Sequence, residues 1–276
     1  MEPALIIAGS VAPLTLPPLP ANSLRFTLAS MIAPASRSFF TMKASCFAIW
    51  PSRSCDPAVV GMGGQPVAGA ETVVFPGVRI NLNLGTETGS GGTAGSVVNH
   101  VGFIVNNVQE QVAKWKANGV AVLPGNNGRL DQAYVETPDG VRIEILEDKT
   151  QTMPIRHEHI HFRVTEGEIP KMQAWYAKTF GGKASTTSNN APVVDLPGTQ
   201  LRFAKDDKAQ LPTRHRVLDH IGFDVKDHAA FVKKIEAEGI KLDEPPRKNA
   251  ATGTTITYIT DPWGTRIELV QRGPTS

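Results

Sequence analysis

Three histidines at nearly regular intervals are the residues of this chain best suited to chemistry. His100, His159 and His220 lie 59 and 61 residues apart, and each stands in a short β-forming run. Glu144 and Glu268 follow the first and the last of them, each inside a later β-forming run. Imidazole and carboxylate groups together bind divalent transition metals. The spacing therefore predicts that a repeated structural unit brings metal ligands together.

The segments around these histidines are copies of one module. They begin NHVGF (99–103), EHIHF (158–162) and DHIGF (219–223), and each leads into an amphipathic helical pattern that ends at glycine. The first and third copies also close alike, with YVETPDGVRIE (134–144) and YITDPWGTRIE (258–268), where Pro and Gly mark a tight hairpin turn. Each module is predicted to fold as β-α-β-β-β.

A further copy is predicted upstream from weaker signals. Its first strand is expected at 23–26, part of its helix at 35–40 and its last strand at 75–82. Residues 1–70 hold nine of the 21 prolines and only six charged residues, a composition that favours loops. This stretch is expected to be an irregular leader or a degenerate first module.

The predicted fold class is α+β, with the modules paired into curved, cup-like mixed sheets and the helices outside. Residues 71–150 would form an N-terminal half, with its clear module at 97–150. Residues 155–272 would form a C-terminal domain that pairs the third and fourth modules. Residues two apart on a strand share a face, so a curled sheet can aim His and Glu side chains into one cup.

Pairing the third and fourth modules would place His159, His220 and Glu268 in one cavity. Two imidazoles and one carboxylate are the set that suits an iron-type divalent ion and leaves open positions for substrate. We therefore predict these three residues as the metal ligands.

The repeated module, with His near its first strand and Glu in its last, resembles the vicinal oxygen chelate superfamily of glyoxalases, bleomycin resistance proteins and extradiol dioxygenases. The resemblance covers roughly 75–271. It implies a sheet curved around a divalent ion, which the substrate chelates through two neighbouring oxygens. Glyoxalase-like members generally use four protein ligands, but here Arg202 stands where the fourth would be. The resemblance thus favours the three-ligand, dioxygenase-like version.

The same resemblance suggests the groups that would act on substrate. Extradiol enzymes carry a histidine shortly before the run that Tyr258 opens, but 247–257 contains none. Tyr258 and His161 are the acid–base candidates in its place, and Arg202 is a candidate partner for an anionic substrate. The N-terminal pair of modules offers Ser23, Asn81, His100 and Glu144, and in four-module relatives that half is commonly metal-free. We expect the same here.

The sequence thus predicts a metal-dependent enzyme, dioxygenase-like, acting on a small oxygenated organic molecule. Fe(II) or Mn is favoured as the ion, with Zn or Ni as the other choices. A glyoxalase-like lyase or isomerase is one alternative. A metal-free small-molecule binder resembling bleomycin resistance proteins is another. A homodimer is a further expectation, because modular sheets of this kind often pair between chains.

Composition excludes several other classes. Hydrophobic residues make up 41% and charged ones 20%, as in a folded globular chain. The net charge is +2 with both signs interspersed, so no nucleic-acid or membrane partner is expected. The two cysteines, Cys46 and Cys55, do not suggest a disulfide scaffold. A cytoplasmic location is expected, although the apolar opening stretch resembles a secretory signal without its positive charges and leaves export open.

Overall fold

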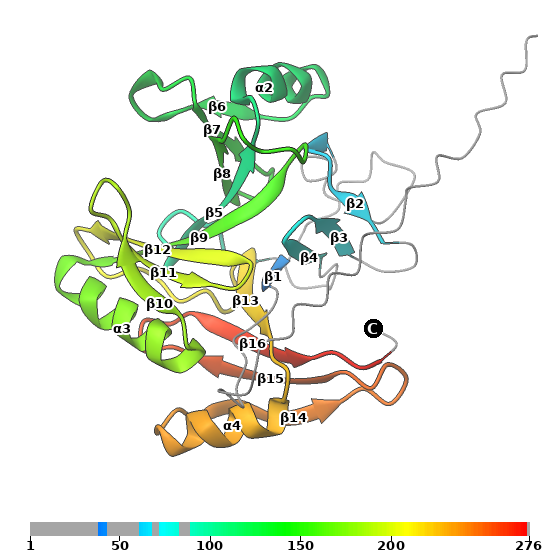
Figure 1. Ribbon diagram of the computed structural model, residues 1–276, viewed down its shortest axis with the longest axis vertical. Helices are drawn as coiled ribbons and strands as arrows, with labels where there is room; N and C mark the ends of the chain where they lie inside the picture. Colours follow the sequence, from blue (N-terminus) through cyan, green and yellow to red (C-terminus); the bar gives the residue numbers. More distant parts are fainter. Residues whose placement is uncertain (1–37, 43–60, 68–71, 83–88, 275–276) are drawn as a thin grey trace, which may run out of the picture. The chain divides into compact units, whose positions relative to one another are not determined.

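Two eight-stranded sheets, each made from the strands of two repeats, form the framework of this computed structural model (Figure 1). The structure describes residues 38–42, 61–67, 72–82 and 89–274, and of 38–42 it describes the backbone only. No helix in these ranges is both long and apolar enough to cross a membrane.

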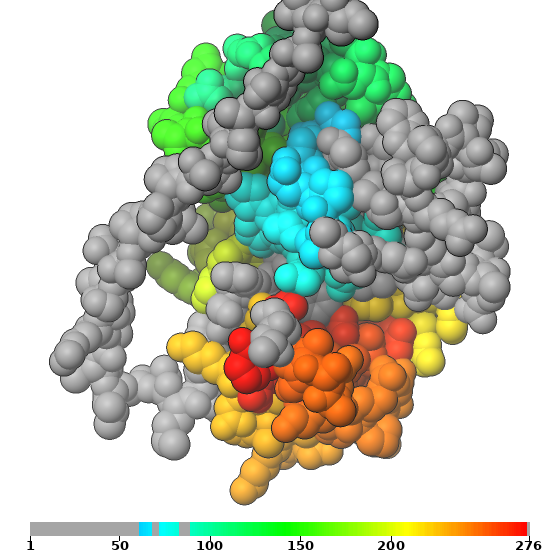
Figure 2. Space-filling view, turned by 90° about the vertical axis from the view of Figure 1, so that its right-hand side faces the viewer, coloured from blue at the N-terminus to red at the C-terminus, as the bar shows by residue number. Residues whose placement is uncertain are grey.

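The first sheet has the strand order β14-β15-β16-β13-β1-β4-β3-β2. Its strands from the first repeat are β1 (Ser38–Met42), β2 (Gln65–Pro66), β3 (Thr72–Phe75) and β4 (Val78–Leu82). Those from the fourth repeat, which also contains helix α4 (His228–Ala237), are β13 (Leu218–Asp224), β14 (Leu242–Lys248), β15 (Thr255–Thr260) and β16 (Arg266–Gln271). Figure 2 shows described parts of both repeats, cyan and orange, on one face of the molecule.

The second sheet has the strand order β10-β11-β12-β9-β5-β8-β7-β6. The second repeat supplies β5 (Val98–Val105), α2 (Val108–Ala117), β6 (Val122–Pro124), the 3-10 turn η1 (Asn126–Gly128), β7 (Gln132–Glu136) and β8 (Arg142–Glu147). The third supplies β9 (Arg156–Thr165), the 3-10 turn η2 (Glu166–Glu168), α3 (Ile169–Phe180), β10 (Lys183–Thr186), β11 (Pro192–Leu196) and β12 (Thr199–Asp206).

The predicted helices are confirmed together with their end signals. Asn107 and Asp227 cap α2 and α4 by accepting backbone N–H groups with their side chains. Gly181 ends α3 in the left-handed conformation, at φ +70°, which glycine adopts without steric cost. The buried apolar residues on these helices pack on one face of the sheets, and β-branched and aromatic side chains fill the core between them.

The predicted α+β fold of paired modules is confirmed, but the pairing is not the one expected. Antiparallel contact between β5 and β9 joins the second and third repeats, and contact between β1 and β13 joins the first and fourth. The expected division between 71–150 and 155–272 stays a prediction, although β8 and β9, which lie on either side of it, belong to one sheet.

The expectations for the first repeat have mixed outcomes. Its last strand, predicted at 75–82, is present as β4 and the turn before it. The prediction of a helix over 35–40 is wrong for residues 38–40, the part of this range that the structure describes, because Ser38, Phe39 and Phe40 belong to β1. The strand expected at 23–26 lies outside the described residues.

Candidate metal centre

Four side chains from the centre of the second sheet converge on one point. His100 comes from β5, Glu144 from β8, and His159 and His161 from β9. One potential ligand atom of each lies within 4.8 Å of those of the other three. We call these four residues the His–Glu cluster. It is the one group of metal-ligating side chains at such spacing in the part of the chain that the structure describes.

Strand register accounts for this convergence. His159 stands opposite Gly102 across the β5–β9 junction, and Glu144 stands beside the same glycine in β8. A Cβ atom at Gly102 would lie 1.9 Å from Cε1 of His159, so only glycine lets that ring lie over β5. His100 in turn stands opposite His161. The cluster therefore forms exactly where two repeats meet.

The nitrogens that face the centre have no hydrogen-bond partner. Nε2 of His159 lies 3.1 Å from Oε2 of Glu144, and Nε2 of His100 lies 3.3 Å from the same oxygen. Both nitrogens are buried and make no hydrogen bond. The same is true of both ring nitrogens of His161. Ligands bound to one ion at about 2.1 Å lie roughly 3–4 Å from each other, which matches these separations.

The outer nitrogens of the two coordinating rings are held by neighbouring residues. Nδ1 of His100 lies 2.9 Å from Oδ1 of Asn99, and Nδ1 of His159 lies 2.5 Å from Oε2 of Glu158. A ring that donates its Nδ1–H to these oxygens presents an Nε2 lone pair to the centre. Metal-bound histidines have this arrangement of outer hydrogen bonds.

Burial and neighbouring groups set the charges in the cluster. Burial works against ionisation of Glu144, but its close contacts with the His100 and His159 rings outweigh burial and hold the pKa of Glu144 well below its usual range. Burial lowers the pKa of His100 and, more strongly, that of His161. A carboxylate and neutral imidazoles are the protonation states that bind a cation.

A cation fits this donor set. Two imidazole lone pairs aimed at a carboxylate oxygen repel one another unless a positive charge lies among them, and buried polar groups without partners are costly. Three nitrogens and one carboxylate suit Fe(II), Zn, Ni or Mn better than Mg or Ca. The chain therefore contains a potential site for a divalent ion.

The predicted set His159, His220 and Glu268 is not brought together. His159 lies in the second sheet, whereas His220 and Glu268 lie in the first, on β13 and β16. The repeats are so alike that local patterns do not reveal which two share a sheet. The prediction went wrong because it paired the third module with the fourth rather than with the second.

His220 and Glu268 form a closed pair instead. Nε2 of His220 hydrogen-bonds to Oε2 of Glu268 at 3.2 Å, and its Nδ1 to Oδ1 of Asp219 at 2.8 Å. Burial would lower the pKa of His220, but these two acidic partners raise it. Both ring nitrogens are thus satisfied without an ion, unlike those of His100 and His159.

The other predicted residues divide between the two sheets. His161 belongs to the His–Glu cluster. Arg202, on β12, pairs with Glu158 at 2.6 Å and so supports the carboxylate that holds His159. Tyr258 lies in the first sheet, with its ring 5.2 Å from that of His220, and the corresponding tyrosine of the cluster is Tyr134.

The expected grouping of His100 and Glu144 with Ser23 and Asn81 is also corrected. His100 and Glu144 are completed by the third repeat, not by the first. Asn81 lies on β4 of the other sheet, and Ser23 lies outside the described residues. One sequence signal supports the observed pairing: the connection between the second and third repeats, 148–155, is shorter than 207–217 between the third and fourth.

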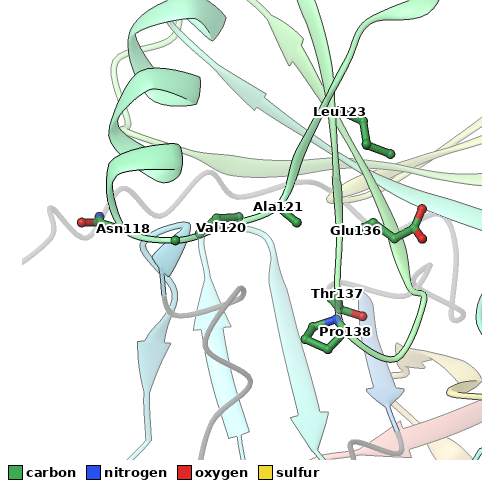
Figure 3. Close-up of a pocket in the computed structure, with 8 residues that line it drawn as sticks. Asn118, Val120, Ala121, Leu123, Glu136, Thr137 and Pro138 are labelled. Atoms are coloured by element: carbon green, nitrogen blue, oxygen red, sulfur yellow. The ribbon is translucent and has the colours of Figure 1, made fainter.

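A separate surface pocket of about 340 Å³ lies where α2 ends (Figure 3). It is lined by residues 118–121, Leu123 and residues 136–138, and it contains no member of the His–Glu cluster. Glu136 is its one titratable group. This pocket has none of the convergent groups that catalysis requires.

The sequence comparisons agree with this architecture. The profile of the Glyoxalase/Bleomycin resistance protein/Dioxygenase superfamily matches residues 159–269. A curated relative, the probable chloroplastic lactoylglutathione lyase of Arabidopsis thaliana, is 25% identical over 191 residues, which are 64% of this chain and 53% of that protein. The chain thus spans about half the length of this relative.

Solved structures show the same fold at low identity. Glyoxalase I from Zea mays is 14% identical with a TM-score of 0.59, covering 86% of this chain and 92% of that one. A putative dioxygenase from Bacillus subtilis is 14% identical with a TM-score of 0.62, covering 88% of this chain and 87% of that one. Residues 159–269 thus match the Glyoxalase/Bleomycin resistance protein/Dioxygenase superfamily, and the described residues share the fold of these two solved structures.

Proposed function

We propose that the protein is a metal-dependent enzyme that acts on a small oxygenated organic molecule at the His–Glu cluster. The observation that carries the proposal is the pair of buried Nε2 atoms, of His100 and His159, that approach Oε2 of Glu144 without hydrogen-bonding to it. His161 is the fourth ligand. At the matching position of β12, Arg202 stands where the module would carry a glutamate. The imidazole of His161 provides the fourth ligand instead of that carboxylate.

The ion, when bound, supplies Lewis-acid activation of substrate oxygens at its open positions. The chain supplies the rest. Asn99 and Glu158 fix the rings of His100 and His159. Burial, together with the charge of Glu144, raises the pKa of Tyr134 to about 12, so its phenol stays protonated and donates a hydrogen bond.

The reaction type we favour is dioxygenase-like with Fe(II). The cluster contains one carboxylate rather than two, and Arg202 stands where a glyoxalase-like fourth ligand is expected. A glyoxalase-like lyase is the alternative, supported by the names of the plant relatives. A cytoplasmic location, a homodimer and the lack of a nucleic-acid partner stay predictions.

Metal content tests the site. Protein purified without chelator is expected to contain about one equivalent of a divalent ion, and His100→Ala or His159→Ala should lose it. His220→Ala is the matched control and should keep it, because His220 occupies the same position in the other sheet. A wild-type protein that binds no divalent ion after reconstitution would favour the metal-free binder.

Activity assays then separate the reaction types. Fe(II)-loaded protein is expected to consume oxygen with catechol-type substrates, whereas Zn- or Ni-loaded protein should not. Turnover of lactoylglutathione without oxygen uptake would support the lyase instead. His161→Ala is informative in both cases, because lost or weakened metal binding supports its role as ligand. Full metal content with lost activity would make it an acid–base group.

A further inference from the structure

One buried amide, Gln132 on β7, connects Glu144 to the loop 125–131. Its side chain is buried, with Nε2 donating a hydrogen bond to Oε1 of Glu144. Its Oε1 accepts a hydrogen bond from the backbone N–H of Asn126 at 2.9 Å. Both ends of one side chain are therefore used, one on a metal ligand of the proposed site and one on the loop.

The surroundings fix the orientation of this amide. A flipped Gln132 would turn its oxygen towards the Glu144 carboxylate and its NH₂ group towards the N–H of Asn126, and both contacts would be repulsive. Tyr134 adds to the network, since its hydroxyl donates to Oε1 of Glu144 at 3.1 Å and accepts from Nδ2 of Asn126 at 2.9 Å. Oε1 of Glu144 is thus occupied, and only Oε2 faces the histidines.

The other sheet provides an internal comparison. Tyr134 pairs with Glu144 as Tyr258 pairs with Glu268, so Gln132 corresponds to Ile256. Ile256 offers no hydrogen-bond donor, and there Glu268 hydrogen-bonds to its own histidine. In the copy that has the glutamine, Nε2 of His100 and Nε2 of His159 make no hydrogen bond, whereas in the copy that has isoleucine Nε2 of His220 bonds to Glu268.

We propose that Gln132 is a positioning residue that keeps Glu144 open for an ion and couples occupancy of the site to the loop 125–131. The inference rests on the proposed metal site. An ion on Oε2 fixes the Glu144 carboxylate, and that carboxylate then holds Gln132 in place. Gln132 in turn holds the amide of Asn126, so the loop becomes ordered when the ion binds.

The loop is suited to such coupling. It contains two left-handed positions, Asn127 at φ +53° and Gly128 at φ +73°, and it carries Leu130, which is 71% exposed. Besides Gln132 and Tyr134, Gln109 on α2 holds this loop, since its Nε2 donates to the carbonyl oxygen of Leu130 at 2.7 Å. Gln109 makes no contact with Glu144 and so provides a matched control.

The test uses Co(II) as the probe and follows two quantities, Co(II) affinity with its absorption spectrum and hydrogen exchange of the Asn126 amide. In the wild type, Co(II) is expected to slow that exchange at least tenfold. Gln132→Met, of equal length but without hydrogen bonds, should weaken Co(II) binding about 10- to 100-fold, as loss of an outer partner does. It should also alter the spectrum and abolish the Co(II)-dependent protection of Asn126.

Gln109→Met should loosen the loop with or without Co(II) and leave its affinity and spectrum unchanged. Gln132→Ile places the residue of the other sheet at this position and should behave as Gln132→Met does. The second variant ensures that the result does not depend on one poorly folded protein, and circular dichroism checks that both variants fold. Wild-type Co(II) affinity and spectrum in both Gln132 variants would overturn the inference while leaving the metal site intact. A wild type that binds no Co(II) would overturn the proposed function itself.

Discussion

At the scale of single residues, Gly102 decides whether His159 can enter the cluster. A methyl group at this position would overlap the imidazole, so Gly102→Ala must displace the ring or the strand. We expect the variant to lose about 1–3 kcal/mol of stability and to bind Co(II) at least tenfold more weakly. Isothermal titration and urea unfolding measure the two effects. Gly167→Ala is the control, because nothing lies within 4 Å of the added carbon, and equal behaviour of the two variants would contradict the argument.

Glu158 is predicted to matter as the outer partner of His159. Glu158→Ala removes the acceptor of the Nδ1–H and should lower metal affinity about 10- to 100-fold. The matched change in the other sheet is Asp219→Ala, because Asp219 holds Nδ1 of His220 in the same way. Metal titration of both variants should show the loss only in Glu158→Ala. A loss of similar size in Asp219→Ala would mean that the first sheet also binds the ion.

The sequence predicted the residue types of the cluster and one of its members, but not the set. His100, Glu144 and His159 stand at repeat positions that the pattern identifies, and of the three predicted ligands only His159 lies in the cluster. His100 and Glu144 were set aside because their partner repeat was taken to be the poor first one. The orienting residues Gln132 and Glu158 could not be found, since their roles depend on register between strands that are distant in the chain.

At the scale of elements, helices α2 and α4 each begin at a side-chain cap. Asn107 accepts from the N–H of Glu110 and Asp227 from that of Ala230, at 3.1 and 2.9 Å. Asn107→Ala and Asp227→Ala are each expected to lower the free energy of unfolding by about 1 kcal/mol. Urea unfolding measures this, and Co(II) affinity should not change because neither cap touches the cluster. An unchanged unfolding free energy would show that the tertiary contacts of the helices make their caps redundant.

The elements could be predicted because their signals are local. Helical periodicity, caps and the glycines at helix ends act within a few residues, and the turns at Gly140 and Gly264 adopt positive φ as a hairpin requires. Pairing of repeats is different. Each module presents a nearly identical first strand, and the free energy that favours β9 beside β5 comes from contacts such as Gly102 with His159 that no single segment contains.

At the scale of the whole molecule, the two sheets are joined by a buried acid. Asp261, in the turn before β16, lies against Tyr176 of α3, whose hydroxyl is 2.8 Å from Oδ2. The carboxyl also faces the backbone N–H groups of Trp263 and Thr265, both on Oδ1, and the hydroxyl of Thr265. Burial outweighs these hydrogen bonds and raises the pKa of Asp261 from 3.8 to about 6. The folded protein therefore holds this proton more tightly than the unfolded chain does.

This linkage predicts how stability depends on pH. Because the folded pKa is raised, the contribution of Asp261 is fully present below about pH 4 and is lost as pH rises through 6. The loss is on the order of 3 kcal/mol for a shift of about two pH units. The variant Asp261→Asn cannot ionise at this position. The difference in unfolding free energy, wild type minus variant, should therefore fall by about 3 kcal/mol between pH 4 and pH 7. Urea unfolding of both proteins at unit pH intervals measures this difference. If the difference stays constant or rises with pH, the hydrogen bonds of Tyr176, Trp263 and Thr265 keep the carboxylate ionised at the junction between the sheets.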